Sequence, residues 1–339
     1  MIRPFRFSDS LFLQRLIRQS APLQLERHLT QPYSPLWAAL GAPLPWHGSG
    51  AATYLHIPSE TDPQIDGFIQ AIKRPARDEA DITYIAPLLD DAPADVVWGS
   101  LLEYVAVEAG EHGIQRLYLC IASDDPGCEL VSNSGYTPYI RETLFRLAST
   151  PQTNNAQDAS PQIRPQREAD SVALQRLFSR YSPPVVQKAE GMFASNDDAP
   201  SPLALRSWWL PEQAEGLVFE EQGEIIAAAH IQHGNAGHWL RLFGDPSATD
   251  VMAELLNHSL KTLSHRRNHP VYCAIRPYQS RFGPLLRALG FTPEQEITRF
   301  VKHTTSFVKR PALQRAHEAI EGSIPGLIPT DFSLKPPKK

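Results

Sequence analysis

The first residues of the chain, IRPFRFSDSLFLQRL (Ile2–Leu16), return in its second half as IRPQREADSVALQRL (Ile163–Leu177). The two stretches share the opening Ile-Arg-Pro, a second Arg, an Asp-Ser pair and a Leu-Gln-Arg-Leu run. Each predicts a short strand, a capping Asp or Ser, and an amphipathic helix. Because self-similarity at a fixed offset marks a duplicated unit, the 339-residue chain is predicted to hold two related modules.

The closing elements of the two copies match as well. GYTP at 135–138 reappears as GFTP at 290–293. Each tetrapeptide is followed by a predicted strand and preceded by a predicted helix and strand: 97–109, 117–121 and 142–147 in the first copy, and 251–263, 271–275 and 297–302 in the second. A repeat of both ends in the same order favours a duplication over a chance match.

The middle of each copy predicts a three-stranded antiparallel meander. In the second copy the strands are 216–219, 224–232 and a segment ending at Phe243, joined by turns at EEQG (220–223) and GNAG (234–237). In the first copy they are 52–57, 65–71 and 81–85. The predicted fold is therefore α/β (α+β): two tandem modules, each a mixed, mostly antiparallel sheet flanked by helices.

The predicted domain boundaries follow from this repeat. Module 1 is 1–148 and module 2 is 163–309. Between them, 149–162 is a polar linker rich in Ser, Thr, Asn, Gln and Pro. The tail, 310–339, is predicted to hold one short helix at 313–321 and then a proline-rich segment. The two modules are expected to pack as an intramolecular pseudo-dimer.

Charge and cysteine content narrow the possible functions. The formal net charge of −5 and a pI of about 6.2 argue against a nucleic-acid partner. No segment resembles a membrane span or a signal peptide, so no membrane partner is expected. The three cysteines, Cys120, Cys128 and Cys273, have no CxxC spacing, which argues against a disulfide framework or a zinc site. A reducing cytoplasm is the predicted compartment.

The order of elements, with a hairpin at 217–231 and a closing Gly-Tyr/Phe after a short helix, resembles the GNAT acetyltransferase superfamily. In that family acyl-CoA inserts where the fourth strand ends at a splay in the sheet. Its pantetheine arm pairs with this strand, and its pyrophosphate lies on the N-terminus of the following helix. The resemblance implies strand ends at 84–86 and 242–244, with helices starting near Asp95 and Thr249.

The two copies differ at the predicted phosphate loop. The first copy has Asp90, Asp91 and Asp95 and no glycine before Gly99, so it would repel a pyrophosphate. The loop of the second copy is less unfavourable to a pyrophosphate, because it contains Gly244 and the hydroxyl groups of Ser247 and Thr249. Its predicted cofactor-binding residues are Leu242, Phe243, Gly244, Ser247, Ala248 and Thr249. The alternative interpretation is structural: Gly244 makes a turn and Ser247 or Thr249 caps the helix.

Catalysis of acyl transfer needs a deprotonated amine, a stabilised oxyanion and a proton for the thiolate. At the position of the tyrosine acid found in many family members, this chain has Val131 and Leu286. The remaining catalytic candidates are Tyr278 as an acid and His230 or Glu224 as a base acting through water. Each of the three has a packed or solvated role as the alternative. Proximity of amine and thioester also accelerates transfer without an acid.

Histidines and tryptophans offer two further interpretations. His230 and His233 are three residues apart, so on a strand they face opposite ways and are not expected to chelate a metal together. No metal site is predicted. Trp46, Trp208 and Trp209 could line an acceptor pocket, but core packing is the more common role of large aromatic side chains.

Two functions follow from the sequence. The first is an acyl-CoA-dependent N-acyltransferase, with acetyl-CoA or another acyl-CoA as co-substrate and the primary amine of a small molecule or peptide as acceptor. Any activity is predicted in module 2, and module 1 is predicted to be degenerate. The alternative is a non-catalytic GNAT-fold protein, a pseudoenzyme that binds a ligand or another protein, because a fold alone does not fix a function.

Overall fold

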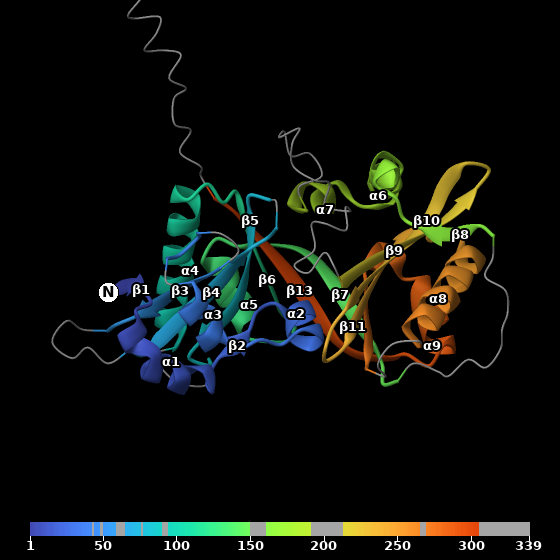
Figure 1. The fold of residues 1–339 in the computed structure, drawn as a ribbon. Coiled ribbons are helices and arrows are strands. Elements are labelled where there is room, and N and C mark those ends of the chain that lie inside the picture. The colour runs from blue at the N-terminus through green and yellow to red at the C-terminus, as the bar shows by residue number, and fades with distance from the viewer. Residues whose placement is uncertain are drawn as a thin grey trace, which may run out of the picture. The chain divides into compact units, whose positions relative to one another are not determined.

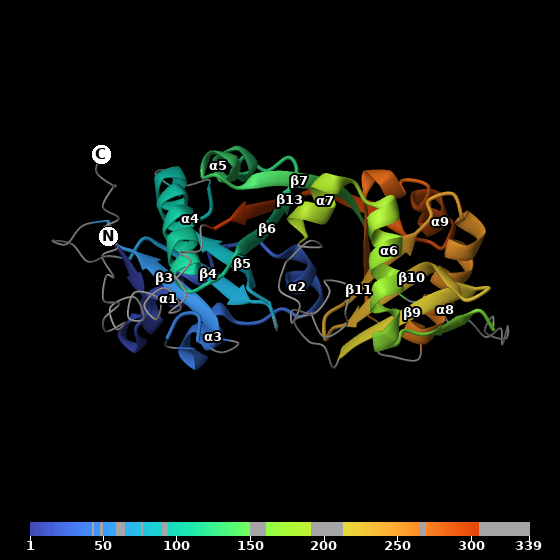
Figure 2. The ribbon, with the colours of Figure 1, turned by 90° about the horizontal axis from the view of Figure 1, so that it is seen from above.

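A single mixed sheet of 13 strands runs through the described part of the chain (Figures 1 and 2). The computed structural model describes residues 1–42, 44–47, 50–58, 65–75, 77–89, 94–149, 161–190, 213–264 and 269–304. These residues belong to one compact unit, Met1–Ser306. We call 1–149 the first half and 161–304 the second half. The predicted tail with its helix at 313–321, most of the linker, and Trp208 and Trp209 lie outside the described residues.

The described elements follow a similar order in both halves, although the first half has an additional short strand and helix after its first long helix, and the second half has an additional 3-10 helix near its end. In the first half they are β1 (Ile2–Pro4), the 3-10 helix η1 (Phe7–Asp9), α1 (Ser10–Ile17), β2 (Ala21–Pro22), α2 (Leu25–Thr30), α3 (Pro35–Gly41), β3 (Ala51–His56), β4 (Gly67–Lys73), β5 (Glu79–Ala86), α4 (Ala94–Glu111), β6 (Arg116–Ala122), α5 (Gly127–Asn133) and β7 (Thr137–Leu147). In the second half they are β8 (Ile163–Pro165), η2 (Glu168–Asp170), α6 (Ser171–Tyr181), α7 (Pro184–Ala189), β9 (Ala214–Glu221), β10 (Glu224–His233), β11 (His238–Gly244), α8 (Thr249–Ser264), β12 (Val271–Ile275), η5 (Pro277–Gln279), α9 (Phe282–Ala288) and β13 (Thr292–His303).

The repeated opening motif makes the same ion pair in both halves. Arg3 binds Asp9 through two nitrogen–oxygen contacts of 2.7 and 2.8 Å, and Arg164 binds Asp170 at 2.8 and 3.0 Å. Such two-point arginine–carboxylate pairs are strong and directional. Asp9 also accepts the backbone N–H of Arg6 at 2.8 Å. Both copies have an arginine and an aspartate six residues apart because the aspartate carboxylate joins the first strand to the start of the first helix.

The repeated glycines end helices. Gly135 follows α5 with a φ of +82°, and Gly290 follows α9 with a φ of +90°. This left-handed conformation is the usual helix stop, and glycine adopts it without a Cβ clash. The aromatic residue after each glycine, Tyr136 or Phe291, is buried in the core. Together these two roles account for the matching Gly-Tyr and Gly-Phe.

The predicted fold class is confirmed, but the two halves share their sheet more closely than the sequence indicates. The strand order is β1-β3-β4-β5-β6-β13-β7-β12-β11-β10-β9-β8, with β2 paired to β5. The last strand of the second half, β13, lies between β6 and β7 of the first half. In turn β7 pairs with β12 of the second half. Each half thus ends in a strand that pairs with the other half.

This exchange explains why the predicted closing strands were too short. They were expected at 142–147 and 297–302, where apolar residues alternate. The structure extends them to Thr137–Leu147 and Thr292–His303. The added residues are mostly exposed and polar. Each added segment pairs with the predicted part of the other strand, as Thr292 does with Arg146 and Thr137 with Val301. A hydrophobic pattern does not reveal such pairing, because neither segment buries an apolar face there.

Helices cover both faces of the sheet, and side-chain alternation divides the core between them. In the first half, Tyr54 and Ile69 lie in the cluster formed with α4, whereas Leu55 and Phe68 face the side of α1 and α3. All four are fully buried. Burial of a large apolar side chain stabilises a fold by about 1.5–3 kcal/mol. In the second half, α8 and α9 pack on the sheet in the same way.

Candidate functional site

In both halves two parallel strands separate from each other at one end, as the resemblance to the GNAT superfamily implies. In the first half, β5 and β6 run parallel and pair only from Glu79–Asp81 to Arg116–Tyr118. In the second half, β11 and β12 pair only from His238–Leu240 to Val271–Cys273. Beyond these points the strands diverge. The predicted cofactor-binding strand ends, 84–86 and 242–244, both lie in the diverging parts.

The gap of the first half is filled by the chain's own backbone. The short strand β2 pairs antiparallel with the end of β5. The next residue, Leu23, donates its N–H to the Thr83 carbonyl oxygen at 2.9 Å and accepts the Cys120 N–H at 2.7 Å. Leu23 therefore bridges β5 and β6, and its side chain is only 1% exposed. A cofactor arm that pairs with β5 would have to displace this segment.

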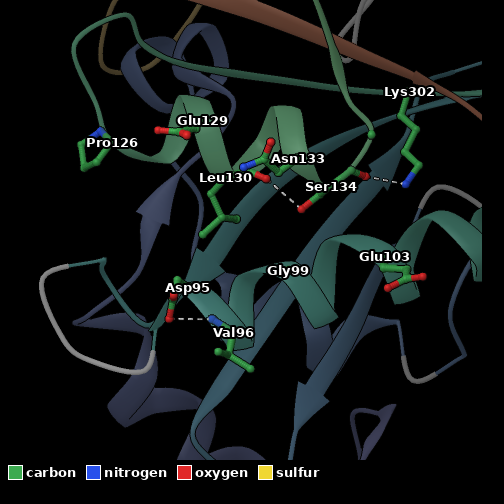
Figure 3. Close-up of a pocket in the computed structure, with 11 residues that line it drawn as sticks. Asp95, Val96, Gly99, Glu103, Pro126, Glu129, Leu130, Asn133, Ser134 and Lys302 are labelled. Atoms are coloured by element: carbon green, nitrogen blue, oxygen red, sulfur yellow. Dashed lines mark hydrogen bonds between the residues drawn. The ribbon is translucent and has the colours of Figure 1, made fainter.

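A groove of about 800 Å³ lies between α4 and α5 of the first half (Figure 3). Its lining includes three carboxylates: Asp95, Glu103 and Glu129. Its one lysine, Lys302, donates to the Ser134 carbonyl oxygen at 2.8 Å. Like charges disfavour an anion here, so the groove does not suit a pyrophosphate. The predicted repulsive residues Asp90 and Asp91 lie outside the described residues.

Among the described residues, the gap of the second half is crossed by a side chain and no backbone segment pairs into it. Gln279 of η5 is 5% exposed and donates from Nε2 to the Leu242 carbonyl oxygen at 2.6 Å. A cavity of about 20 Å³ lies beside it and is lined by residues that include Arg241, Leu242 and Phe243. A volume of about 10–15 Å³ suffices for one water molecule. The end of β11 therefore borders a water-sized, polar cavity.

His230 lies next to this strand end but as a buried, neutral group. Its ring makes an edge-to-face contact with Phe243, with centroids 4.9 Å apart, and its Nε2 lies 2.7 Å from Oε1 of Gln166. Burial, reinforced by the charge of Arg241, lowers the pKa of His230 to about 3. The imidazole is thus uncharged at neutral pH.

Tyr278 packs in the same hydrophobic cluster as Phe243. Its hydroxyl oxygen accepts a hydrogen bond from Nη1 of Arg276 at 2.9 Å and one from Oγ of Ser182 at 3.2 Å. Burial raises the pKa of the Tyr278 phenol, although the nearby arginine partly opposes this effect. The phenol therefore keeps its proton at neutral pH. Tyr278 and Phe243 thus pack against one cluster, and His230 contacts the Phe243 ring.

Glu224, the third catalytic candidate, lies away from this cluster. It is exposed and starts β10, opposite Glu221 in the hairpin. In the ladder between β10 and β11, Ala227 is already opposite Gly244, the last residue of β11. Glu224 therefore lies beyond the end of β11, not beside Leu242 and Phe243.

The loop before α8 holds a carboxylate at its N–H groups. Asp245 accepts hydrogen bonds from the backbone N–H and the Oγ of Ser247 at 2.7 and 2.6 Å. These bonds hold the pKa of Asp245 below its ordinary value. Tyr181 donates to the other carboxylate oxygen at 3.0 Å. Donors at a helix N-terminus favour an anion, and here the chain's own carboxylate fills that role.

The other predicted cofactor residues lie along the same path. Gly244 ends β11 in close packing, since a Cβ there would come within 3.2 Å of the Ala227 Cβ. Ala248 donates its N–H to the Asp245 carbonyl oxygen at 3.1 Å, and Thr249 begins α8. These contacts describe a tight turn and a helix start. The binding of a cofactor by 242–249 stays a prediction.

A charge cluster built around two buried glutamates lies beside the cavity and was not predicted from the sequence. It consists of three arginines and three glutamates: Arg241, Arg276, Arg299, Glu26, Glu142 and Glu190. Glu142 accepts from Nε of Arg299 at 2.6 Å and from Nε of Arg276 at 3.0 Å. Burial alone would raise the pKa of Glu142, but the two arginines hold it below its ordinary value. Arg241 gives a weak signal in the sequence, because it is the one arginine in the largely apolar strand β11.

The remaining predictions concern metals, aromatic residues and membranes. Among the described residues, no group of three or more His, Cys, Asp and Glu side chains could hold a metal ion. Trp46 is buried and donates to the Tyr54 hydroxyl at 2.8 Å, while Val131 and Leu286 are fully buried. In the same part of the chain, no helix has the length and apolar character that crossing a membrane requires.

Comparison with known proteins identifies the fold. No protein-family model and no curated protein matches the sequence. Among solved structures, a tandem GNAT protein from the clavulanic acid biosynthesis pathway matches 89% of this chain and 98% of its own, with a TM-score of 0.50 and 10% identity. A protein from Pyrococcus horikoshii matches 90% of both chains, with a TM-score of 0.50 and 12% identity. A GCN5-related N-acetyltransferase from Sphaerobacter thermophilus has a TM-score of 0.47, 16% identity, and matches of 89% and 95%.

The described residues have the fold of the GNAT acetyltransferase superfamily, as the sequence predicted. The likeness spans most of the chain and includes a tandem member of that superfamily. At these identities it establishes the fold. The chemistry has to be argued from the site.

Proposed function

We propose that the protein is an acyl-CoA-dependent N-acyltransferase that transfers an acetyl group to a primary amine in its second half. One contrast supports this proposal. The gap beside β5 is closed on both sides by the backbone of Leu23, whereas the gap beside β11 is crossed by the side chain of Gln279. A side chain with rotatable bonds moves aside more readily than a segment paired into a sheet. The second half is therefore the better acceptor of a cofactor arm.

The loop before α8 supports the proposal independently. The N–H and hydroxyl of Ser247 already bind one anion, the carboxylate of Asp245. A phosphate would take the place of that carboxylate at the same donors. The residues at the end of β11, Leu242 to Gly244, would then lie along the pantetheine arm. Acetyl-CoA supplies the activated thioester, and the chain's own groups bind and orient it.

Tyr278 suits the proton transfer that acyl transfer requires. Its phenol keeps its proton at neutral pH and lies in the same cluster as Phe243. A protonated phenol near the strand end can give its proton to the departing thiolate. His230 is neutral and buried, so it packs against Phe243 rather than carrying charge. Alignment of the amine with the thioester supplies much of the remaining acceleration.

The proposal extends to the assembly and the compartment. The exchange of β7 and β13 supports two GNAT-like modules joined as an intramolecular pseudo-dimer, with module boundaries near 148 and 163. Cys120 and Cys273 are buried free thiols, and Cys128 is also free. Unpaired thiols suit a reducing cytoplasm.

A matched pair of variants tests the proposal. Ser247→Glu places a carboxylate at the predicted pyrophosphate site, and Val96→Glu places one in the first turn of α4 in the first half. Both positions are exposed, and an acid near a helix N-terminus does not destabilise the helix. In calorimetric titration with acetyl-CoA, wild type and Val96→Glu should bind equally and Ser247→Glu should bind at least about tenfold more weakly. No binding by the wild type at millimolar acetyl-CoA would refute the proposed function.

A further inference from the structure

The filled gap of the first half fixes the position of α2. Leu23 is held to β5 and β6 by backbone hydrogen bonds, and α2 begins two residues later. The helix then packs on the second half: Leu25 and Leu29 lie in a cluster with Trp239 and Tyr272. Its last residue, Thr30, accepts the Ala236 N–H at 3.0 Å. The first half thus directs α2 onto β11.

Glu26 is the charged residue that α2 brings to β11. The residue is 1% exposed, and both of its carboxylate oxygens accept hydrogen bonds from Nη2 of Arg241, at 2.6 and 2.8 Å. Nη2 of Arg299 lies 3.6 Å away. A buried carboxylate requires such partners, because removal from water strongly disfavours its charge. The contact is therefore specific in position and in sign.

Arg241 lies at the point where β11 separates from β12. The pairing of β11 with β12 ends at Leu240, so Arg241 is the first residue of the diverging segment. Arg241, Leu242 and Phe243 all line the water-sized cavity. A change in the Arg241 side chain thus acts on the same strand end that is proposed to pair with the cofactor.

The charge cluster divides unequally between the halves. All three arginines, Arg241, Arg276 and Arg299, belong to the second half. Glu142 holds Arg276 and Arg299, and Glu190 also pairs with Arg276. Glu26 binds Arg241, so two of the three glutamates come from the first half. Each of the three arginines near the end of β11 therefore pairs with a glutamate of the first half, Glu26 or Glu142.

We propose that Glu26 is a positioning residue for the acyl-transfer site of the second half. It holds Arg241, and with it the segment 241–243, in the conformation that receives acetyl-CoA. This inference rests on the proposed function. It gives the first half a role in the reaction although its own gap is filled: it supplies a carboxylate to the neighbouring site.

Three variants separate positioning from mere stability. Glu26→Gln keeps the shape and removes the charge, and Glu26→Asp keeps the charge on a shorter side chain. Thr30→Val removes the hydrogen bond from Thr30 Oγ1 to the Glu26 carbonyl oxygen, and so weakens α2 without changing charge. The two measurements are acetyl-CoA affinity by calorimetry and the unfolding midpoint without ligand. We expect Glu26→Gln to bind at least about tenfold more weakly, and Glu26→Asp to stay within about threefold of wild type. Thr30→Val should lower the midpoint and leave affinity unchanged.

The outcomes discriminate between the two proposals. If Glu26→Gln binds like wild type, or if the loss of affinity follows the unfolding midpoint in all three variants, the positioning role is refuted and the proposed function stands. If wild type itself shows no binding, the proposed function fails, and this inference fails with it. If Glu26→Gln does not fold, Arg241→Gln tests the same ion pair at its other partner, whose side chain is partly exposed. It should weaken binding as Glu26→Gln does, and wild-type affinity there would refute the inference.

Discussion

The backbone N–H of Leu23 lies 2.9 Å from the carbonyl oxygen of Thr83, inside the gap between β5 and β6. This hydrogen bond joins an N-terminal segment to the strand that would otherwise pair with a cofactor. A separate groove of the first half, between α4 and α5, is lined by three carboxylates. In the first half, the backbone of Leu23 blocks the gap between the strands, and the carboxylates of the groove repel a phosphate. The gap of the second half is crossed by the side chain of Gln279 instead.

A stoichiometry of one acetyl-CoA per chain follows from that closure. Leu23→Ala should lower the free energy of unfolding by about 2–5 kcal/mol, because Leu23 is fully buried. It should leave the affinity and stoichiometry of acetyl-CoA binding unchanged. Calorimetry and chemical denaturation measure these quantities. Two sites of similar affinity in the wild type would contradict the closure.

Removal of the Asp245 carboxylate should strengthen cofactor binding. In wild type this group occupies the Ser247 donors and adds a negative charge where the pyrophosphate is proposed to bind. Asp245→Asn should raise acetyl-CoA affinity by about two- to tenfold, on the scale of a helix-terminus charge effect. The matched control is Asp95→Asn at the start of α4, whose carboxylate accepts the Val96 N–H at 2.9 Å. An equal gain in both variants would argue against a site before α8.

The phenol of Tyr278 should affect turnover more than binding. Tyr278→Phe removes the proton donor and keeps the ring that packs against the same cluster as Phe243. We expect kcat for acetyl transfer to a panel of small primary amines to fall by about 100-fold or more, with acetyl-CoA affinity nearly unchanged. The control is Tyr136→Phe, which loses a buried hydrogen bond to the Leu102 carbonyl oxygen in the first half. Equal kcat values for Tyr278→Phe and wild type would remove Tyr278 from the mechanism.

His230 should make the protein less stable as the pH falls. Its pKa is lowered to about 3 in the folded protein, whereas an unfolded histidine titrates near 6.5. Between these values the unfolded state binds the extra proton. The stabilisation is therefore complete above about pH 6.5 and is lost progressively toward pH 3. His230→Gln should flatten the fall in unfolding free energy between pH 6.5 and 5 by up to about 1.4 kcal/mol per pH unit. An unchanged pH slope in the variant would show that His230 is accessible to protons in the folded state.

The repeat made the fold predictable because its motifs have local causes. The pairs Arg3–Asp9 and Arg164–Asp170 and the helix-ending glycines act within a few residues of each other. The strands β5 and β11 also end where the resemblance to the GNAT superfamily implies, within 84–86 and 242–244. Tyr278 packs against the same cluster as Phe243, and His230 contacts the Phe243 ring, whereas Glu224 lies beyond the end of β11. The catalytic roles of all three stay predictions.

The parts of the site that the sequence did not predict depend on contacts between segments far apart in the chain. Pro22 and Pro183 match in the repeat, yet Pro22 pairs into the sheet and Pro183 precedes α7. A local pattern does not distinguish these outcomes. Similarly, Glu26 and Arg241 are 215 residues apart, and each by itself resembles an ordinary surface charge. Their contact exists only because β7 and β13 join the two halves in one sheet.

The exchange of β7 and β13 also has a consequence for synthesis on the ribosome. When β6 and β7 have emerged, their shared partner β13 is still about 145 residues from being made. At about 5–20 residues per second this interval lasts roughly 7–30 s. During it the nascent chain carries unpaired strand edges, which attract other chains. The order of translation therefore makes this protein depend on its last strand, and a chain truncated before Thr292 should aggregate rather than yield a folded first half.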